Sequence, residues 1–500
     1  MSMPAASHLP VLPVIVPLLT APLVVLLRER GLAWAATLAA SACTFAMAVN
    51  LVGLVRAGGP LSYELGGWPA PYGIELAVDA FSALLLLIVT GASTVALLAA
   101  RTSLEREIPA ARQHLFYTAW LLALAGLIGI VVAGDAFNIF VFLEISSLAT
   151  YILVAGGPRR QALPAVFKYL MMGTIGATFY LIGVGLVYMM TGTLNLADMA
   201  VRIREVTEVK PVLIAGGFIT VGLALKAAVF PLHGWLPNAY RFAPHAATAF
   251  IAACSTKVAL YVLVRFDFVV FRGNLPGSIE QFSVHVLPLA VAAIVLGSAI
   301  AVFERDLKRL LAWSSIAQVG YILLAVSLVS VTGLTAGVTH MFSHALAKGA
   351  LFLAVACLAM TFADLSVEGL AGAARRMPIT MAGFVAAGLS LIGVPGTVGF
   401  VSKWYLVLGA LELGPRGALL IAPALASSLL AAVYIWRVVE AAWFLPGDAD
   451  ERRQEAPWWM LAVLWAAVLL NVYFGFRPGV PLELADSAAY VLLGLAGPES

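Results

Sequence analysis

Residues 217–240 read GFITVGLALKAAVFPLHGWLPNAY, an apolar run that contains Lys226 and is interrupted by Pro231. A second stretch of this kind, GVPGTVGFVSKW at residues 393–404, places Pro395 shortly before Lys403. Within a lipid bilayer, a broken helix is tolerated only where its freed backbone groups meet protein or water. Both stretches therefore predict a broken membrane helix with a lysine beside the break.

The composition of the whole chain also indicates a membrane protein. Hydrophobic residues make up 62% of the 500 positions, charged residues make up 11%, and the mean hydropathy is +0.99. So few polar residues cannot cover a soluble globule. The three cysteines, Cys43, Cys254 and Cys357, lie far apart, which excludes a disulfide framework and a CxxC-type metal or iron–sulfur site. No basic block or glycine-rich nucleotide loop is present, so nucleic acids and nucleotides are not expected partners.

Fourteen apolar runs are long enough to cross a membrane, so the sequence predicts an all-α, polytopic protein of about 14 transmembrane helices. They lie near residues 9–27, 32–55, 76–100, 115–133, 136–155, 163–191, 211–232, 244–264, 286–303, 311–329, 334–363, 378–410, 418–444 and 457–476. The run from Leu9 to Leu27 lacks a cationic n-region, so we expect the first membrane helix there rather than a cleavable targeting peptide. The last apolar stretch, residues 482–495, is short and follows two prolines, so we expect an interfacial segment.

Lysine and arginine are distributed unequally between the two sets of loops. The odd-numbered loops hold 15 of these residues and the other loops hold 8. Because Lys and Arg accumulate in cytoplasmic loops, this difference predicts a multi-pass protein of the bacterial inner (plasma) membrane with both termini on the outer face.

Six basic residues remain inside the predicted spans. They are Lys168, Lys226, Lys257, Lys348, Lys403 and Arg437. A lysine at the centre of a membrane helix costs about 2.5–3.5 kcal/mol, so five isolated lysines would cost on the order of 12–18 kcal/mol. They must pair, face water or change protonation. Lys168, near a helix start, is a candidate for the proton path but can equally snorkel to the interface. Arg437 is expected to pair with Glu440 on its own helix.

One carboxylate and two histidines are the expected partners of the lysines. Glu144, in GDAFNIFVFLEISS at residues 134–147, stands about ten residues into its helix and so near mid-membrane. His340, His344 and Lys348 follow one another at steps of four residues along one side of a helix, a spacing that suits relayed protons. The histidines could instead bind haem or a metal, but no other predicted helix offers a matching ligand set. We therefore expect a relay or satisfied core histidines, and no metal or cofactor.

A weak internal repeat relates the two broken helices. GFITVGLALK at residues 217–226 matches GFVAAGLSLI at residues 383–392 at five of ten positions, with an offset of 166 residues. The offset spans five predicted helices, an odd number, so the two copies cross the membrane in opposite directions. Such inverted repeats place an ion path at their broken helices near mid-membrane. The predicted units are residues 1–114 (three helices), 115–270 (helices 4–8), 271–444 (helices 9–13) and 445–500 (helix 14 and the interfacial tail).

On these motifs the chain resembles the antiporter-like subunits shared by complex I (NADH:quinone oxidoreductase), membrane-bound hydrogenases and Mrp (multiple resistance and pH) cation/proton antiporters. The matching stretches are GDAFNIFVFLEISS, LALKAAVFPLHGWLPNAY, STKVALYVLVRF, RDLKRLLAWSSIAQVGY, HMFSHALAKGALFL and GVPGTVGFVSKWYL. The resemblance implies that Glu144 pairs with Lys226, that Lys257 connects the two halves and that Lys403 ends the proton path.

Three features favour the D subunit of Mrp antiporters within this group. They are MTGTLNLADMA at residues 190–200, lysine at position 403, and Gln318, where many complex I relatives carry histidine. We therefore expect a proton-translocating subunit of a multisubunit Na+/H+ antiporter, and a proton-pumping M/N-like subunit of complex I or a hydrogenase is the alternative. The expected partners are other subunits, lipid, protons and Na+.

The chain is expected to be a transporter subunit rather than a catalytic chain. A redox subunit that holds quinone or a cofactor itself is a second class, which no cysteine cluster or haem-ligand set supports. A stand-alone solute symporter is a third class, and transport by the isolated chain would identify it.

Overall fold

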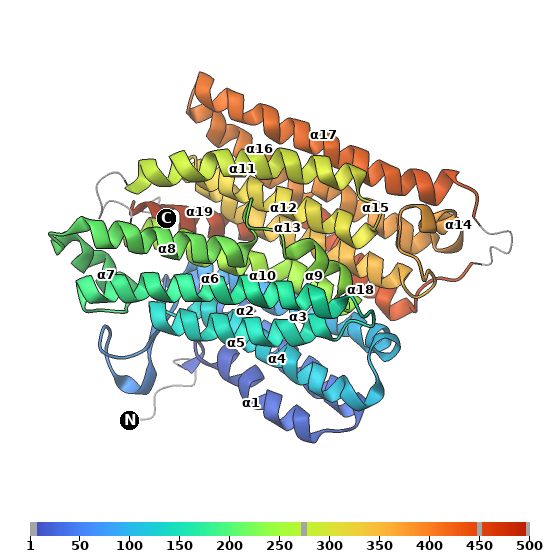
Figure 1. Ribbon diagram of the computed structural model, residues 1–500, viewed down its shortest axis with the longest axis horizontal. Coiled ribbons are helices and arrows are strands. Elements are labelled where there is room, and N and C mark those ends of the chain that lie inside the picture. The colour runs from blue at the N-terminus through green and yellow to red at the C-terminus, as the bar shows by residue number, and fades with distance from the viewer. Residues whose placement is uncertain (1–7, 272–277, 448–452, 497–500) are drawn as a thin grey trace.

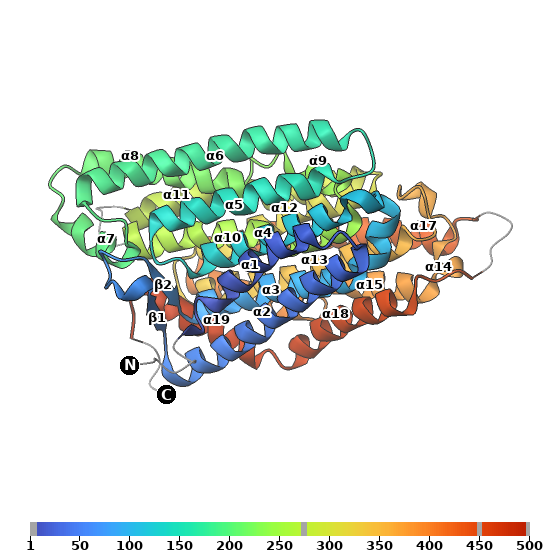
Figure 2. The same cartoon turned by 90° about the horizontal axis from the view of Figure 1, so that it is seen from below.

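The computed structural model describes residues 8–271, 278–447 and 453–496. Its helices are α1 (Leu12–Leu26), α2 (Arg30–Gly58), α3 (Ala80–Glu107), α4 (Ala110–Val132), α5 (Ala136–Ala155), α6 (Ala162–Thr191), α7 (Leu196–Arg202), α8 (Val209–Ala227), α9 (Leu236–Phe242), α10 (His245–Arg265), α11 (Ser278–Phe303), α12 (Leu307–Val326), α13 (Val331–Leu358), α14 (Ala373–Arg376), α15 (Pro378–Ile392), α16 (Val398–Glu412), α17 (Pro415–Phe444), α18 (Trp458–Phe476) and α19 (Gly479–Leu493). A π-helical turn, η4 (Phe266–Phe271), extends α10, and the short 3-10 turns are η2 (Leu65–Gly67), η3 (Ile203–Glu205) and η5 (Glu368–Leu370). The long helices run side by side in one bundle (Figures 1 and 2).

The predicted number of membrane segments agrees with the structure. Within the described part of the chain, 12 helices are long and apolar enough to cross a membrane, and two shorter apolar helices, α1 and α15, bring the total to 14 segments. Several of these helices start at a side-chain cap: the carboxylates of Asp79, Asp135 and Asp306 accept from backbone N–H groups in the first turns of α3, α5 and α12. The chain is thus a polytopic, nearly all-helical membrane protein.

Both predicted helix breaks are present. α8 ends at Ala227, and Ala228 adopts a left-handed conformation with φ of 56°. α15 ends at Ile392, where Gly393 has φ of 91°, and the chain resumes as α16 at Val398. Pro231 and Pro395 both lie in the non-helical segments between the paired helices, as the sequence predicts.

Helices α10, α12 and α13 form the centre of the bundle and bury nearly all of their length (Figures 1 and 2). Glycine permits unusually close packing beside them. A Cβ on Gly222 of α8 would lie 2.5 Å from the carbonyl oxygen of Gly176 on α6, and a Cβ on Gly126 of α4 would lie 2.6 Å from the backbone nitrogen of Ser146 on α5. Small residues are a common device for helix contact in lipid. Here they bring α6 close to α8, which carries Lys226, and α4 close to α5, which carries Glu144.

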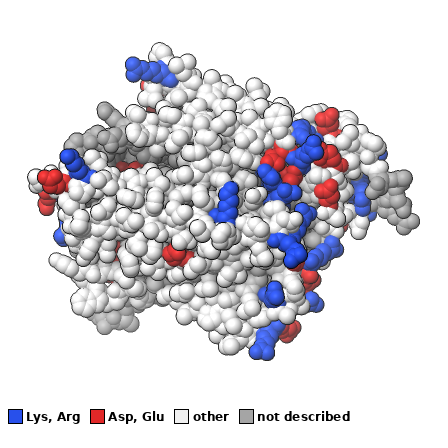
Figure 3. Space-filling view, viewed as in Figure 1, with Lys and Arg blue, Asp and Glu red and all other residues white. Residues whose placement is uncertain are grey.

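Charged residues gather at the two ends of the bundle, and the middle of the visible face is almost free of them (Figure 3). We call one end, on the right in Figure 1, the basic end. It carries Arg106, Arg159, Arg241, Arg305 and Arg375, which follow or precede the membrane helices in odd-numbered loops. Two of the loop arginines that were counted to predict the orientation in the membrane, Arg272 and Arg452, lie outside the described residues.

The structure adds features that differ from the expectations. A two-stranded antiparallel sheet, β1 (Leu61–Glu64) and β2 (Glu75–Val78), joins α2 to α3 in a chain expected to be helical throughout. β2 overlaps the start of the apolar run expected at residues 76–100, whose helix α3 begins only at Ala80, and four-residue strands are too short to be told from the start of such a run. The stretch expected as an interfacial segment forms α19, whose buried face packs against α13 and α3, so it is part of the bundle.

The expected pair of Arg437 and Glu440 is wrong. Arg437 donates instead to the carbonyl oxygens of Val302 and Glu304, which end α11, and no ion pair joins it to Glu440 in the part of the chain that is described. A helix end offers carbonyl groups without an intrahelical donor, so a neighbouring arginine is drawn to it.

Candidate functional site

Lys226 and Glu144 form an ion pair, as the sequence predicts. The Nζ atom of Lys226 lies 3.5 Å from Oε1 of Glu144, and it donates a shorter hydrogen bond of 2.7 Å to Oγ of Ser147. Ser147 stands three residues after Glu144, so both side chains project from one face of α5. The Lys226 side chain is 7% exposed and the Glu144 side chain 31%. The ammonium is therefore shared between a carboxylate at the bundle surface and a buried hydroxyl.

The break after α8 leaves Lys226 free for this contact. The indole Nε1 of Trp235, in the segment leading to α9, donates to the carbonyl oxygen of Leu225 at 2.9 Å. A backbone group released by the break thus has a partner other than the lysine. Trp235 is itself held by ring stacking on Tyr169 of α6, with the ring centroids 4.1 Å apart.

A small polar cavity lies between Lys226 and α10. Its volume is about 30 Å³, and its wall includes Ser146, Ser147, Thr150 and Ser255 beside Lys226. A space of this size holds a water molecule when polar groups surround it. Because Ser255 stands two residues before Lys257, the cavity leads from the first ion pair to the central helix.

Lys257 lies on α10 at the centre of the bundle and is fully buried. Its Nζ donates to the carbonyl oxygen of Ala252 at 2.5 Å, and its charge interacts with His344 and Lys348 of α13. Lys348, also fully buried, donates to the carbonyl oxygen of Leu311 at 2.7 Å and to the hydroxyl of Ser314. The two buried lysines therefore have only neutral hydrogen-bond partners, and each lies within the electrostatic influence of the other.

The histidines on α13 continue the polar chain. His344 stacks on His340 with ring centroids 6.4 Å apart, and neither ring nitrogen of His344 has a hydrogen-bond partner among the described residues. His340 bonds through Nε2 to Oε1 of Gln318 and through Nδ1 to Oγ of Ser402, both at 2.8 Å. A buried imidazole requires partners for its nitrogens, so water is the expected partner of His344.

Lys403 is the last ionisable group of the polar chain and lies at the second helix break. Its Nζ donates to the carbonyl oxygens of Leu391 at 3.1 Å and Ile392 at 2.9 Å, which the end of α15 releases, and to Oγ of Ser428 at 2.9 Å. It also lies 4.7 Å above the ring of Tyr321. The adjoining Ser402 contacts His340, so Lys403 is next to the histidines. The second lysine thus occupies the break, whereas the first stands beside it.

The structure places seven of the eight predicted ionisable residues in the polar chain described above, five of them buried and Glu144 and Lys403 partly exposed. In order they are Glu144, Lys226, Lys257, His344, His340 and Lys403, and Lys348 interacts with Lys257 and His344 from the side. Lys168 is the exception: it is exposed on α6, near Gly234 in the segment after Pro231. The predicted role of Lys168 is therefore weaker, because its ammonium reaches the surface of the bundle.

Sequence reasoning missed the neutral members of the chain. Ser147, Ser402, Tyr321 and Ser428 each hold a lysine or histidine, and Gln318 was weighed only as a mark of subfamily. Serine and tyrosine are common in apolar helices, so their presence alone is no signal. Ser147 and Ser402 could have been suspected from their places three residues after Glu144 and directly before Lys403.

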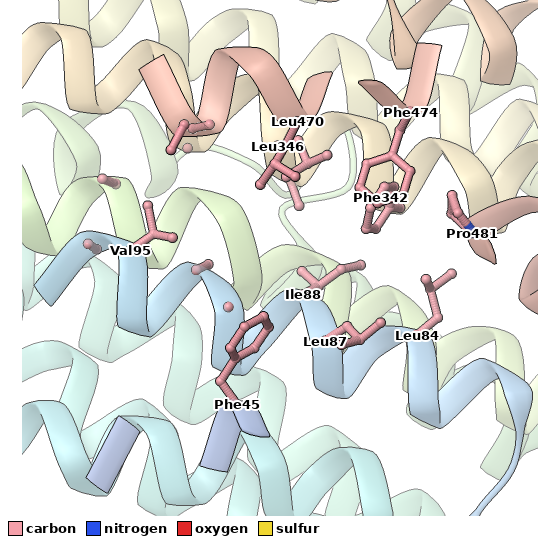
Figure 4. A pocket seen from close by; sticks show the side chains of 18 of the residues that line it. Phe45, Leu84, Leu87, Ile88, Val95, Phe342, Leu346, Leu470, Phe474 and Pro481 are labelled. Atoms are coloured by element: carbon pink, nitrogen blue, oxygen red, sulfur yellow. The ribbon is translucent and has the colours of Figure 1, made fainter. Parts of the chain in front are cut away.

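An apolar cavity lies apart from the polar chain. It has a volume of about 250 Å³ and a nearly wholly apolar wall that includes Leu84 and Ile88 of α3, Phe342 and Leu346 of α13 and Leu470 of α18 (Figure 4). A wall without polar groups cannot stabilise a charge or a water file, so we assign it no part in proton movement.

Known proteins share both the sequence pattern and the fold of this protein. The family model described as NADH:quinone oxidoreductase/Mrp antiporter, TM, matches residues 133–430. The chain belongs to this family. The matched region of the antiporter family contains Glu144, Lys226, Lys257 and Lys403. The buried polar chain therefore falls within the part of the molecule that defines the family.

Members of both branches of the antiporter family are similar to this chain. It is 44% identical to the N subunit of NADH-quinone oxidoreductase from Desulforudis audaxviator over 89% of each chain. It is 29% identical to the D subunit of the Na(+)/H(+) antiporter from Bacillus subtilis over 97% of each chain. Among solved structures, a chain of the Mrp complex from Dietzia sp. superposes with a TM-score of 0.89 and 27% identity over 98% of each chain.

Proposed function

We propose that this chain translocates protons as the D subunit of a multisubunit Na+/H+ antiporter of the bacterial inner membrane. The observation that carries the proposal is the series of largely buried ionisable groups, which starts at the Lys226–Glu144 pair and ends at Lys403. Charged groups at hydrocarbon depth are costly and persist where they serve ion movement. The similarity to the D subunit of the Bacillus subtilis antiporter over nearly the full length supports the same assignment.

In this mechanism Lys226 acts as a switch. The nearby Glu144 carboxylate favours the charged ammonium, and burial favours the neutral amine. Movement of Nζ between Glu144 at 3.5 Å and Ser147 at 2.7 Å changes that balance, so the lysine gains or releases a proton. At a membrane potential of 100 mV each translocated charge involves about 2.3 kcal/mol, which is comparable to one charge-assisted hydrogen bond. Modest rearrangement can therefore couple to transport.

The path joins two units that we propose to be inverted repeats, residues 115–270 and 271–444. Protons enter the first unit near Lys226, and Lys257 passes them through His344 and His340 to Lys403 in the second. Lys348 is a side branch that exchanges protons with Lys257. The excess of basic residues in the odd-numbered loops supports a cytoplasmic basic end and outward termini.

A second function is favoured by a specific observation. The relative with 44% identity is named as a quinone oxidoreductase subunit, so a proton-pumping subunit of a redox-driven complex is the alternative. The polar chain would work in the same way in either complex. The difference lies in the partners and in the source of energy.

Substitution of Lys226 tests proton translocation. In the assembled complex in everted membrane vesicles, Lys226→Ala should abolish ion-coupled proton movement, measured with a pH-sensitive dye. Lys210→Ala is the matched control, because Lys210 lies on the same helix and is exposed. Wild-type transport by an assembled Lys226→Ala complex would refute the proposal.

The driving force separates the two functions. If the chain works in an antiporter, addition of Na+ to vesicles should cause proton movement without any electron donor. The Lys226→Ala variant should then show no such proton movement. Proton movement that requires a reductant and quinone, and ignores a Na+ gradient, would favour the redox-driven alternative and exclude the antiporter.

A further inference from the structure

A second cluster of buried ionisable groups lies at the basic end, where α3 ends and α10 and α12 begin. Its members are Glu107, His245 and Lys308, whose side chains are almost enclosed: Glu107 is 10% exposed, the His245 side chain is 18% exposed, and Lys308 is 3% exposed. None of them belongs to the polar chain described above. The sequence places all three next to loops, so they pass for solvated residues at helix ends.

Glu107 contacts His245, and Lys308 binds the backbone just before α10. The carboxylate of Glu107 accepts from the backbone N–H of His245 at 2.9 Å and from the hydroxyl of Ser103 at 2.5 Å, and it lies 3.9 Å from the His245 Nε2. Lys308 donates to the carbonyl oxygen of Ala243 at 2.6 Å and interacts with the Glu107 charge. The Glu107 carboxylate and the Lys308 ammonium therefore both lie near the start of α10, where each influences the other through its charge.

Other charges lie around this cluster. Asp306 at the start of α12, which pairs with Arg241 at 3.0 Å, interacts with Lys308, and Arg159 in the loop after α5 interacts with both Lys308 and His245. Arg159 is exposed, so the cluster is directly below the surface of the basic end. A proton arriving from solvent would meet these groups first.

Unpartnered polar atoms lead inward from the cluster. His245 Nδ1 and the hydroxyl of Tyr240 are buried and have no hydrogen-bond partner within the described ranges. The ring of Tyr240 lies 5.8 Å from that of Phe352, one helical turn beyond Lys348 on α13, and its hydroxyl interacts with Cys254, one turn before Lys257. Tyr240, five residues before His245 in the chain, thus lies next to the turns of α10 and α13 that adjoin the two central lysines.

α12 provides a parallel connection. Lys308 stands three residues before Leu311 and six before Ser314, the two groups that bind the Lys348 ammonium. At 1.5 Å per residue this separation is about 9 Å along the helix, which two long lysine side chains and one or two waters can span. α12 therefore places Lys308 within two helical turns of the groups that bind Lys348.

We propose that Glu107, with His245 and Lys308, is a proton-exchange site at the basic end that loads Lys257 and Lys348 directly through Tyr240. The proposal rests on the proposed proton translocation and adds an entrance to the middle of the path, between the two broken helices. Glu107 takes a proton from solvent, and the proton passes by way of the Tyr240 hydroxyl and ordered water to the buried lysines. The same protons return to Glu107 when transport reverses, so the site works in either direction.

Glu107 also caps α10, and the test must separate that role from proton exchange. Glu107→Gln keeps an acceptor for the His245 N–H but removes the exchangeable proton. Glu105→Gln is the matched control, because Glu105 is exposed two residues away on the same helix. Tyr240→Phe is the second variant: the hydroxyl that it removes has no partner among the described residues, so the fold loses no hydrogen bond seen there.

The experiment measures proton flux and its pH dependence in the assembled complex in everted vesicles. We expect Glu107→Gln and Tyr240→Phe each to slow flux on the order of tenfold or more, the scale of a lost proton-transfer group, with normal assembly. The Glu107→Gln variant should also lose the dependence of flux on pH at the basic end, and Glu107→Asp should restore it. A purely structural cap would not alter a pH profile in this way.

Two results would overturn the proposal: wild-type flux in Tyr240→Phe, or wild-type flux and pH dependence in Glu107→Gln, while Lys226→Ala is inactive in the same vesicles. If Glu107→Gln does not assemble, Tyr240→Phe decides by itself. Active transport by Lys226→Ala would instead refute the proposed function, so the two failures are distinguishable.

Discussion

Gly393 is the residue whose replacement tests the second break most directly. It adopts a left-handed conformation, with φ of 91°, at the point where α15 ends. A Cβ at this position would lie 2.8 Å from Cδ of Lys403 and 3.5 Å from its Nζ. Gly393→Ala therefore strains the backbone and pushes the lysine away from the break.

The size of the effect follows from the contacts. An L-residue in the left-handed region costs about 1–2 kcal/mol, which should appear as lower stability of the complex. Displacement of Lys403 by a few tenths of an ångström or more weakens its bond to the Ile392 carbonyl, now 2.9 Å. A hydrogen bond to a charged group is worth about 1.5–3 kcal/mol, so proton flux should fall roughly ten- to a hundredfold if that bond positions the lysine for transfer.

The assay compares proton flux in everted vesicles with thermal stability of the purified complex. Gly349→Ala is the control: it lies next to Lys348 in α13, and a Cβ there has no atom within 4 Å in the described structure. That variant should transport normally and be as stable as the wild type or slightly more so, because alanine favours helix. Wild-type flux in an assembled Gly393→Ala complex would refute the reasoning that the break positions Lys403.

Ser147→Ala removes the 2.7 Å bond to Lys226, so transport should fall about tenfold, the lower range for a charged hydrogen bond, while Ser327→Ala, whose buried hydroxyl bonds to the last turn of its own helix α12, should have little effect on flux. An equal fall in both variants would contradict a specific role for Ser147. Gln318→Leu leaves Nε2 of His340 unpaired in the core, so both stability, by about 1–3 kcal/mol, and flux should decrease. Thermal unfolding and dye-detected flux measure the two effects, and unchanged values for both would show that Gln318 does not hold the histidine.

The sequence predicted the spans, the two breaks and most of the ionisable chain because each has a local signature. Apolar runs identify the spans, and a proline with an adjoining lysine identifies a break. Glu144, Lys257 and the ladder from His340 to Lys348 are conspicuous because bilayer depth makes charged and polar residues rare. Such signals depend only on the residues of one segment, so they can be recognised without knowing which helices pack against it.

What a segment contacts depends on how helices rotate and pack, and the tertiary structure decided those points. Arg437 was expected to pair within its helix, yet the end of α11 lies closer and offers unpaired carbonyl oxygens. Glu107 and Lys308 look like solvated residues at helix ends, but three helices meet over them and bury both. A helix of one sequence presents many possible faces, and the partner that buries each face comes from residues far away in the chain. The same reason explains Ser147 and Gln318: an ordinary polar residue becomes a ligand of a lysine or histidine only where packing brings that group within hydrogen-bonding distance.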